Sequence, residues 1–77
     1  MIVTEESREF AMNLLATMVA EDRAKQEGKR FEEVFSELRR SKTFEELYDP
    51  ETGLWLNGPD YISDEYDLEL QRRNQRN

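Results

Sequence analysis

Apolar residues recur every three to four positions along the first third of the chain, which is the spacing of one face of an α-helix. Thr4 stands where an N-cap residue is expected, and Gly28 supplies a C-terminal stop. The pattern therefore predicts a helix over residues 5–27 whose apolar stripe faces the core. The stripe consists of two neighbouring rows of side chains: Phe10, Leu14 and Met18, with Ala11, Leu15 and Val19 beside them.

A second run with helical spacing begins directly after the short connection at Gly28. Phe31, Val34, Phe35 and Leu38 occupy positions i, i+3, i+4 and i+7, one face of a three-turn helix. Because the connection is short, we expect this helix to pack antiparallel to the first. The two phenylalanines are expected in the main core.

Residues 43–46 have a hydroxyl at the first position and a glutamate at the fourth, the pattern of a capping box. Thr43 is therefore expected to be the N-cap of a short helix. Pro50 should end that helix, because the residue before a proline avoids the helical conformation. Its inward side chains are expected to be Phe44, Leu47 and Tyr48.

A tight turn is predicted over residues 48–55, which read Tyr-Asp-Pro-Glu-Thr-Gly-Leu-Trp. Pro50 suits a type I turn, and Gly53 can adopt the left-handed conformation after it. Tyr48 and Trp55 would then face each other across the turn and stack. The run resembles chignolin, a designed hairpin peptide. That resemblance implies a self-stabilising turn and no activity.

A last helix is predicted from the Asn-Gly-Pro run at 57–59 to about Arg72, with Pro59 at the first helical position. Ile62, Tyr66 and Leu70 step by four, and Tyr61 and Leu68 by seven; these five should form its buried side. The elements add up to one all-α domain over residues 1–77, with an ordered core over about 4–72. It would be a small bundle of three main helices, one short helix and a hairpin-like turn.

The composition excludes most catalytic chemistry. The chain has 77 residues with no cysteine and no histidine. It therefore lacks thiolate nucleophiles, Ser-His-Asp or Cys-His arrangements and the commonest metal ligand. We expect no enzyme activity and no cofactor. The first residues carry no basic segment of the kind that begins a signal peptide, so we expect a cytoplasmic protein without membrane contact.

The net charge of −7 is concentrated in one segment, because residues 43–71 contain nine acids and no base. Such a segment repels phosphate backbones and favours a basic protein partner. A loose metal site on Asp60, Asp64 and Asp67 is the weaker reading, because calcium and magnesium sites usually draw ligands from loops as well. No metal is expected. The candidate interaction surface combines these acids with nearby aromatics: Tyr48, Trp55, Tyr61, Asp60, Asp64, Glu65 and Asp67.

Basic residues gather near the predicted helix ends, as Lys25, Lys29 and Arg30 and again as Arg39, Arg40 and Lys42. Cations at helix C-termini are common for dipole reasons alone. A nucleic-acid surface would need positive surroundings, so nucleic-acid binding is unlikely. It stays open as the alternative function.

Residues 41–55 follow the pattern S-K-T-aromatic-x-x-L-x-D-x-x-T-G-L-W, and a G-P-x-Y stretch follows at 58–61. The chain is similar in this respect to a group of small bacterial proteins of unassigned activity, some of them antitoxin-like. The resemblance carries no site residue. We therefore expect a small regulatory or interaction protein that binds a protein partner or forms a homo-oligomer, with an antitoxin-like or DNA-binding regulator as the alternative.

Overall fold

The computed structural model describes residues 4–75, and its longest element is α1 (Glu5–Glu27). The Thr4 hydroxyl accepts a hydrogen bond from the Ser7 N–H at 3.1 Å and so caps the helix. Gly28 ends it with a φ of +66°, and its N–H donates to the Ala24 carbonyl. The predicted bounds and both predicted caps of this helix are confirmed.

The other elements are short or moderate in length. They are α2 (Phe31–Arg39), α3 (Lys42–Tyr48), the 3-10 turns η1 (Pro50–Thr52) and η2 (Leu54–Leu56), and α4 (Pro59–Gln75). Residues 4–75 contain no strand, so the all-α prediction is confirmed over the described chain. The last helix runs three residues further than predicted.

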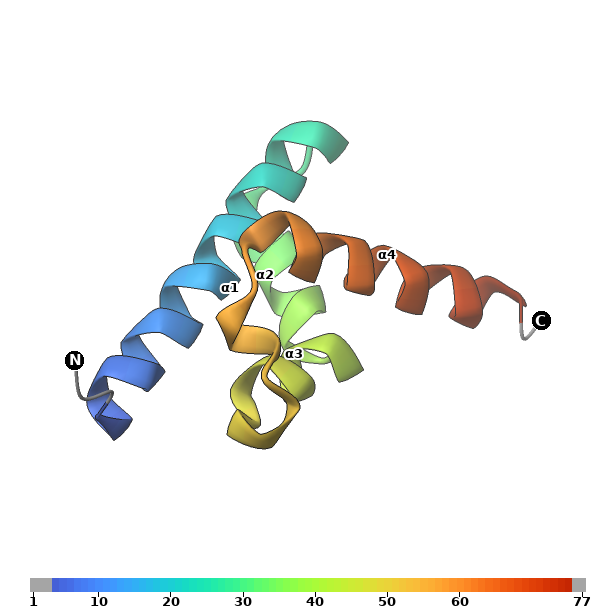
Figure 1. Cartoon of the computed structure of the whole chain (residues 1–77). Helices are drawn as coiled ribbons and strands as arrows, with labels where there is room; N and C mark the ends of the chain where they lie inside the picture. The colour runs from blue at the N-terminus through green and yellow to red at the C-terminus, as the bar shows by residue number, and fades with distance from the viewer. Residues whose placement is uncertain (1–3, 76–77) are drawn as a thin grey trace.

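α1 and α4 are the two long arms of the molecule, and α4 begins against the middle of α1 and extends away from it (Figure 1). The chain reverses after Gly28, and α2 packs against α1 on the side away from the viewer. α3 contacts α1, α2 and α4, while η2 returns to α1. The core therefore lies where α1, α2 and α4 meet above α3.

The core-facing side of α1 matches one row of the predicted stripe and differs from the other. Val19 is buried and Ala11 and Leu15 are half-buried, as expected for the second row. Phe10, Leu14 and Met18 were expected inside, but their exposed fractions are 69%, 49% and 39%. Small side chains line the buried side instead, which lets the neighbouring helices approach α1 closely. The buried residues of α1 are Met12, Ala16, Val19, Ala20, Arg23 and Ala24.

The prediction that Thr43 caps the short helix is wrong. Ser41 is the N-cap of α3, and its hydroxyl accepts from the Phe44 N–H at 3.0 Å. Thr43 lies inside the first turn and is buried. The reason is that Glu69 of α4, rather than Glu46, satisfies the free N–H groups of this turn.

The turn over residues 48–55 is not a hairpin. η1 and η2 follow each other without strand pairing, and Gly53 between them has the predicted left-handed conformation with a φ of +68°. The Tyr48 ring packs on Phe44 with centroids 4.5 Å apart, and no stacking with Trp55 is found within residues 4–75. Trp55 is half-buried against the core instead. The expected Tyr48–Trp55 stack is therefore wrong.

The buried side of α4 is narrower than predicted. Ile62 and Tyr66 are buried and Leu70 is half-buried, but Tyr61 and Leu68 are 50% and 42% exposed. The latter two were expected inside because they are seven residues apart. Leu68 lies in the part of α4 that extends away from the core (Figure 1), whereas Tyr61 lies in the first turn on the side of α4 opposite Ile62 and Tyr66. Phe31 and Phe35 of α2 are half-buried and pack against the edge of the core.

Candidate functional site

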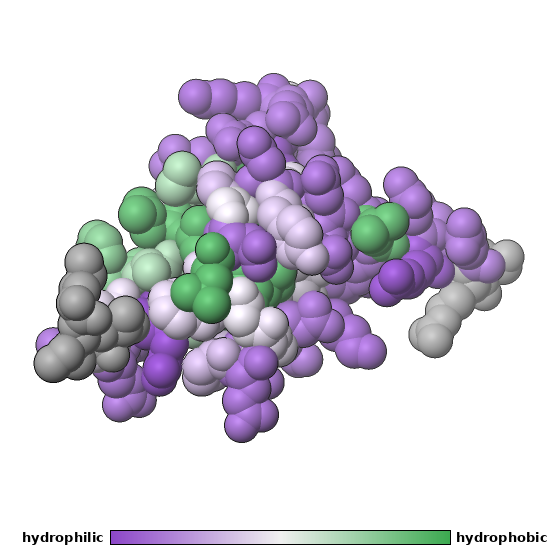
Figure 2. Space-filling view, viewed as in Figure 1, coloured by the Kyte–Doolittle hydropathy of each residue, from purple (hydrophilic) through white to green (hydrophobic). Residues whose placement is uncertain are grey.

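The most exposed apolar side chains of α1 form one row on its outer surface. Phe10, Leu14 and Met18 are spaced four residues apart and therefore lie above one another on one face of the helix. We call these three residues the α1 ridge. Figure 2 shows hydrophobic colour along the outer side of α1, whereas the far end of α1 and most of α4 are hydrophilic.

Two further large side chains are exposed on elements that pack against α1. Leu56 of η2 is 73% exposed and Tyr61 in the first turn of α4 is 50% exposed, and both elements pack against α1. Figure 2 shows the hydrophobic colour continuing from α1 onto the segment beside it. We call the α1 ridge with Leu56 and Tyr61 the apolar face. Contiguous apolar patches on small proteins are typical of surfaces that bind other proteins.

The residues of the candidate interaction surface predicted from the sequence differ in exposure. Tyr61 lies on the apolar face, while Asp60 and Asp64 are exposed near the start of α4. Tyr48 is half-buried, and its hydroxyl donates to the Asn13 side chain. Glu65 and Trp55 are also half-buried. Asp60, Tyr61 and Asp64 are thus exposed together in the first two turns of α4, while the half-buried residues of the set contribute less surface.

Asp67, the remaining member of that set, pairs within the chain. Its carboxylate lies 2.6 Å from the guanidinium of Arg23, which is 8% exposed. The same guanidinium pairs with Glu27 at 3.1 Å and lies over the Tyr66 ring, 4.7 Å from its centroid. Arg23 thus joins α1 to α4 through the charge of Asp67 and the ring of Tyr66, while Glu27 pairs with it from α1 itself. The half-exposed carboxylate of Asp67 is therefore already held in an ion pair within the chain, and a partner would have to compete with Arg23 for it.

Tyr66 is uncharged in this arrangement. Burial raises the pKa of its hydroxyl above the ordinary value, and the nearby Glu37 raises it further, although Arg23 and Arg73 act in the opposite direction. The ring therefore offers Arg23 its neutral π-face and remains part of the core.

Glu69 joins α4 to the first turn of α3. Its carboxylate accepts from the N–H of Lys42 at 3.0 Å and from the N–H and hydroxyl of Thr43, both at 2.8 Å. Arg73 pairs with it at 2.6 Å. Burial acts to raise the pKa of Glu69, but these hydrogen bonds and the Arg73 charge outweigh it, so the pKa lies below its ordinary value.

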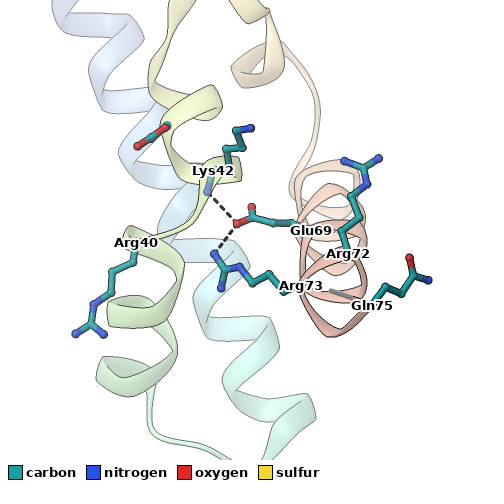
Figure 3. A pocket seen from close by; sticks show the side chains of 7 residues that line it. Arg40, Lys42, Glu69, Arg72, Arg73 and Gln75 are labelled. Atoms are coloured by element: carbon teal, nitrogen blue, oxygen red, sulfur yellow. Dashed lines mark hydrogen bonds and ion pairs between the residues drawn. The ribbon is translucent and has the colours of Figure 1, made fainter. Parts of the chain in front are cut away.

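An open pocket of about 630 Å³ lies beside this carboxylate. It is lined by Arg40, Lys42, Glu45, Glu69, Arg72, Arg73 and Gln75. The pocket brings together cations from the 39–42 cluster and from the end of α4, which are 30 residues apart in sequence. In Figure 3, Lys42 and Arg72 extend to the same side of Glu69, whereas Arg40 points away from it. The pocket is basic at its rim and acidic at its floor.

Within residues 4–75, no group of three or more acidic side chains is arranged to hold a metal ion. None of the helices described there has the length and apolar character needed to cross a membrane. Comparison with family models, curated proteins and solved structures finds no match to the chain.

Sequence reasoning missed the α1 ridge, Arg23 and Glu69 as functional or structural positions. For the α1 ridge the sequence does hold a signal. The helix is apolar on two opposite faces, and a small domain can bury only one of them fully. Arg23 follows Val19 by four residues and so interrupts an apolar row, which marks a charge that needs a buried partner. For Glu69 the sequence holds no comparable signal, since its partners are 26 and 27 residues away.

Proposed function

We propose that the chain is a small interaction protein that works by binding a protein surface, its own or another, through the apolar face. The observation that carries the proposal is the exposure of Phe10, Leu14 and Met18 in one row. A helix that presents such a row fits the apolar face of a partner helix, which is a recurring mode of protein recognition. As expected from the sequence, we also propose that the protein is cytoplasmic and is not an enzyme.

The energetics of the α1 ridge support binding. Full burial of a Leu, Phe or Met side chain contributes about 1.5–3 kcal/mol. The ridge side chains are already part-buried by their own helix, so a partner would gain roughly 1 kcal/mol from each. Aromatic side chains dominate many interfaces, which makes Phe10 and the neighbouring Tyr61 the expected anchors.

A matched pair of variants tests the proposal. Leu14→Gln removes the centre of the ridge, while Leu68→Gln changes a side chain of similar exposure on α4. Each tagged variant is incubated with untagged wild-type chain and lysate of the source organism, and bound proteins are identified by mass spectrometry. We expect wild type and Leu68→Gln to retain the same stoichiometric partner and Leu14→Gln to lose it. Equal capture by all three proteins, or none by any, would contradict the proposal.

A second candidate is phosphate binding at the basic pocket, as in a nucleic-acid-binding regulator. The grouping of Lys42 and Arg72 at one rim supports it, but Glu69 neutralises Arg73 and the chain carries a net charge of −7. The test is fluorescence anisotropy of labelled duplex DNA at low salt. Binding that is weakened by Lys42→Gln and Arg72→Gln, but not by Lys25→Gln, would favour this candidate. No binding at micromolar protein would exclude it.

A further inference from the structure

The charges that flank the α1 ridge decide which kind of partner fits it. We propose that the partner is a second copy of this chain, with the two α1 helices antiparallel and Leu14 at the twofold axis. The inference rests on the proposed function of the apolar face and specifies its occupant.

The two possible directions of the second helix differ in their charge pairing. In a parallel twofold pair, each residue on the line of the ridge lies opposite its own copy, so Lys25, which falls about 20° from Leu14 on the wheel of α1, faces Lys25. Like charges opposite each other repel. A parallel pair of α1 helices would also align their two dipoles. Both effects disfavour the parallel arrangement.

The antiparallel arrangement brings opposite charges together. With Leu14 on the axis, residue 8 lies level with residue 20 of the second copy. Arg8 is then about 3 Å along the axis from Asp22 of the second copy, because the helix rises 1.5 Å per residue. On the wheel of α1, both side chains fall on the Met18 side of the ridge, Asp22 about 80° and Arg8 about 120° from Leu14, so Arg8 lies at the outer margin of the interface and reaches Asp22 of the second copy only with its long side chain.

The same register brings Lys25 near the first turn of the second α1. Lys25 lies about 4.5 Å along the axis from Glu6 of the second copy. Arg8, Asp22 and Lys25 form no ion pair within residues 4–75 of a single chain. Their charges are therefore available to the interface. The charges of α1 thus complement those of a second α1. Binding of an unrelated helix would not require this self-complementary pattern.

The apolar contacts of the antiparallel pair are also self-complementary. Phe10 of one copy lies level with Met18 of the other, and the two Leu14 side chains meet at the axis. An aromatic ring thus packs on a flexible thioether twice, which is a favourable sulfur–aromatic contact. Because the interface repeats itself, it closes at two copies and leaves no unpaired ridge.

Single cysteines introduced into this cysteine-free chain test the register directly. The variants are Phe10→Cys, Leu14→Cys and Met18→Cys, with Leu68→Cys as the control for random collisions. All four positions are exposed, so the fold should persist, and circular dichroism of each variant checks this. Each is oxidised alone, and a tagged Phe10→Cys chain is also oxidised with untagged Met18→Cys.

The antiparallel pair predicts a disulfide for Leu14→Cys alone and for the Phe10→Cys and Met18→Cys mixture, at least tenfold faster than for Leu68→Cys. Phe10→Cys alone should not cross-link above the control. Its two copies are about 12 Å apart along the axis, and a disulfide needs Cα atoms within about 7 Å.

Rapid cross-linking of Phe10→Cys alone and of Met18→Cys alone, with no preference for the mixture, would show a parallel pair and overturn the inference. Cross-linking of every variant at the control rate would overturn it as well. In that second case the capture experiment separates the two proposals. A different protein that Leu14→Gln fails to retain would leave the apolar face as a binding surface for another chain.

Discussion

The carboxylate of Glu69 satisfies both the N–H and the hydroxyl of Thr43, each at 2.8 Å. The Ser41 hydroxyl accepts from the N–H of Phe44, and Glu69 also accepts from the N–H of Lys42. The first three amides of α3 therefore all have partners. A seven-residue helix is marginal without such capping. Two of the three capping hydrogen bonds of α3 therefore come from Glu69 of α4. The same bonds hold α4 against the start of α3.

Glu69→Gln should lower the free energy of unfolding by about 1–3 kcal/mol at pH 7, because charge-assisted hydrogen bonds to buried donors are lost. The measurement is urea denaturation followed by circular dichroism. Asp64→Asn is the control, since Asp64 is exposed and forms no ion pair within residues 4–75. Equal stability of the two variants would contradict the capping role of Glu69.

The same contact predicts a pH dependence. The pKa of Glu69 is lowered in the folded chain, so its stabilising contribution is present above the pKa of the unfolded chain. That contribution is lost as the pH falls below about 4 toward the lower folded-state value. We expect the stability difference between wild type and Glu69→Gln to be constant from neutral pH to about pH 5.5 and to shrink in more acidic solution. A difference that grows on acidification would contradict the lowered pKa.

Arg23→Ala should destabilise the chain by about 1–3 kcal/mol. The variant loses the ion pairs to Asp67 and Glu27 and the packing of the guanidinium on Tyr66. Lys25→Ala, two positions along α1 and exposed, should change stability by less than about 0.5 kcal/mol. Thermal unfolding of both variants provides the comparison, and similar losses would mean that Arg23 does not join α1 to α4.

Gly53→Ala should cost about 1–2 kcal/mol, because an L side chain is strained at a φ of +68°. A Cβ at this position would meet only the Leu56 Cδ1 at 4.0 Å, so the cost is backbone strain rather than a clash. Gly58→Ala is the matched control, since its φ is outside the left-handed region and a Cβ there meets nothing within 4 Å. Chemical denaturation of both variants should show a loss for the first alone.

The sequence predicted the local elements of this fold well, because they depend on local signals. The Thr4 and Gly28 caps define α1, and Pro50 and Gly53 define the turns. The sequence could not reveal that Ser41 replaces Thr43 as the cap, because the deciding partner, Glu69, comes from a distant helix. Tertiary contacts of this kind are invisible to periodicity.

The choice of the buried face of α1 failed for a different reason. Periodicity identified two neighbouring apolar rows, and hydrophobicity alone favours burying both. The row with Leu15 and Val19 does pack on the core, but the row of Phe10, Leu14 and Met18 is exposed. The chain buries the row with Ala16 and Ala20 instead, where small side chains permit close helix packing. The exposed row, which was assigned to the core, is thus the one that forms the candidate site. Asp67, which was predicted to belong to the interaction surface, pairs instead with Arg23, which is 44 residues away in the sequence.

The central claim is that the α1 ridge is an interface, and sedimentation velocity over a range of concentrations tests it most directly. For wild type and Leu68→Gln, we expect the mass to rise from 9.2 kDa toward twice that value as the concentration increases. Leu14→Gln should remain at 9.2 kDa to concentrations at least about tenfold higher. A wild-type mass of 9.2 kDa at every concentration, together with capture of the same proteins by wild type and Leu14→Gln, would contradict the account.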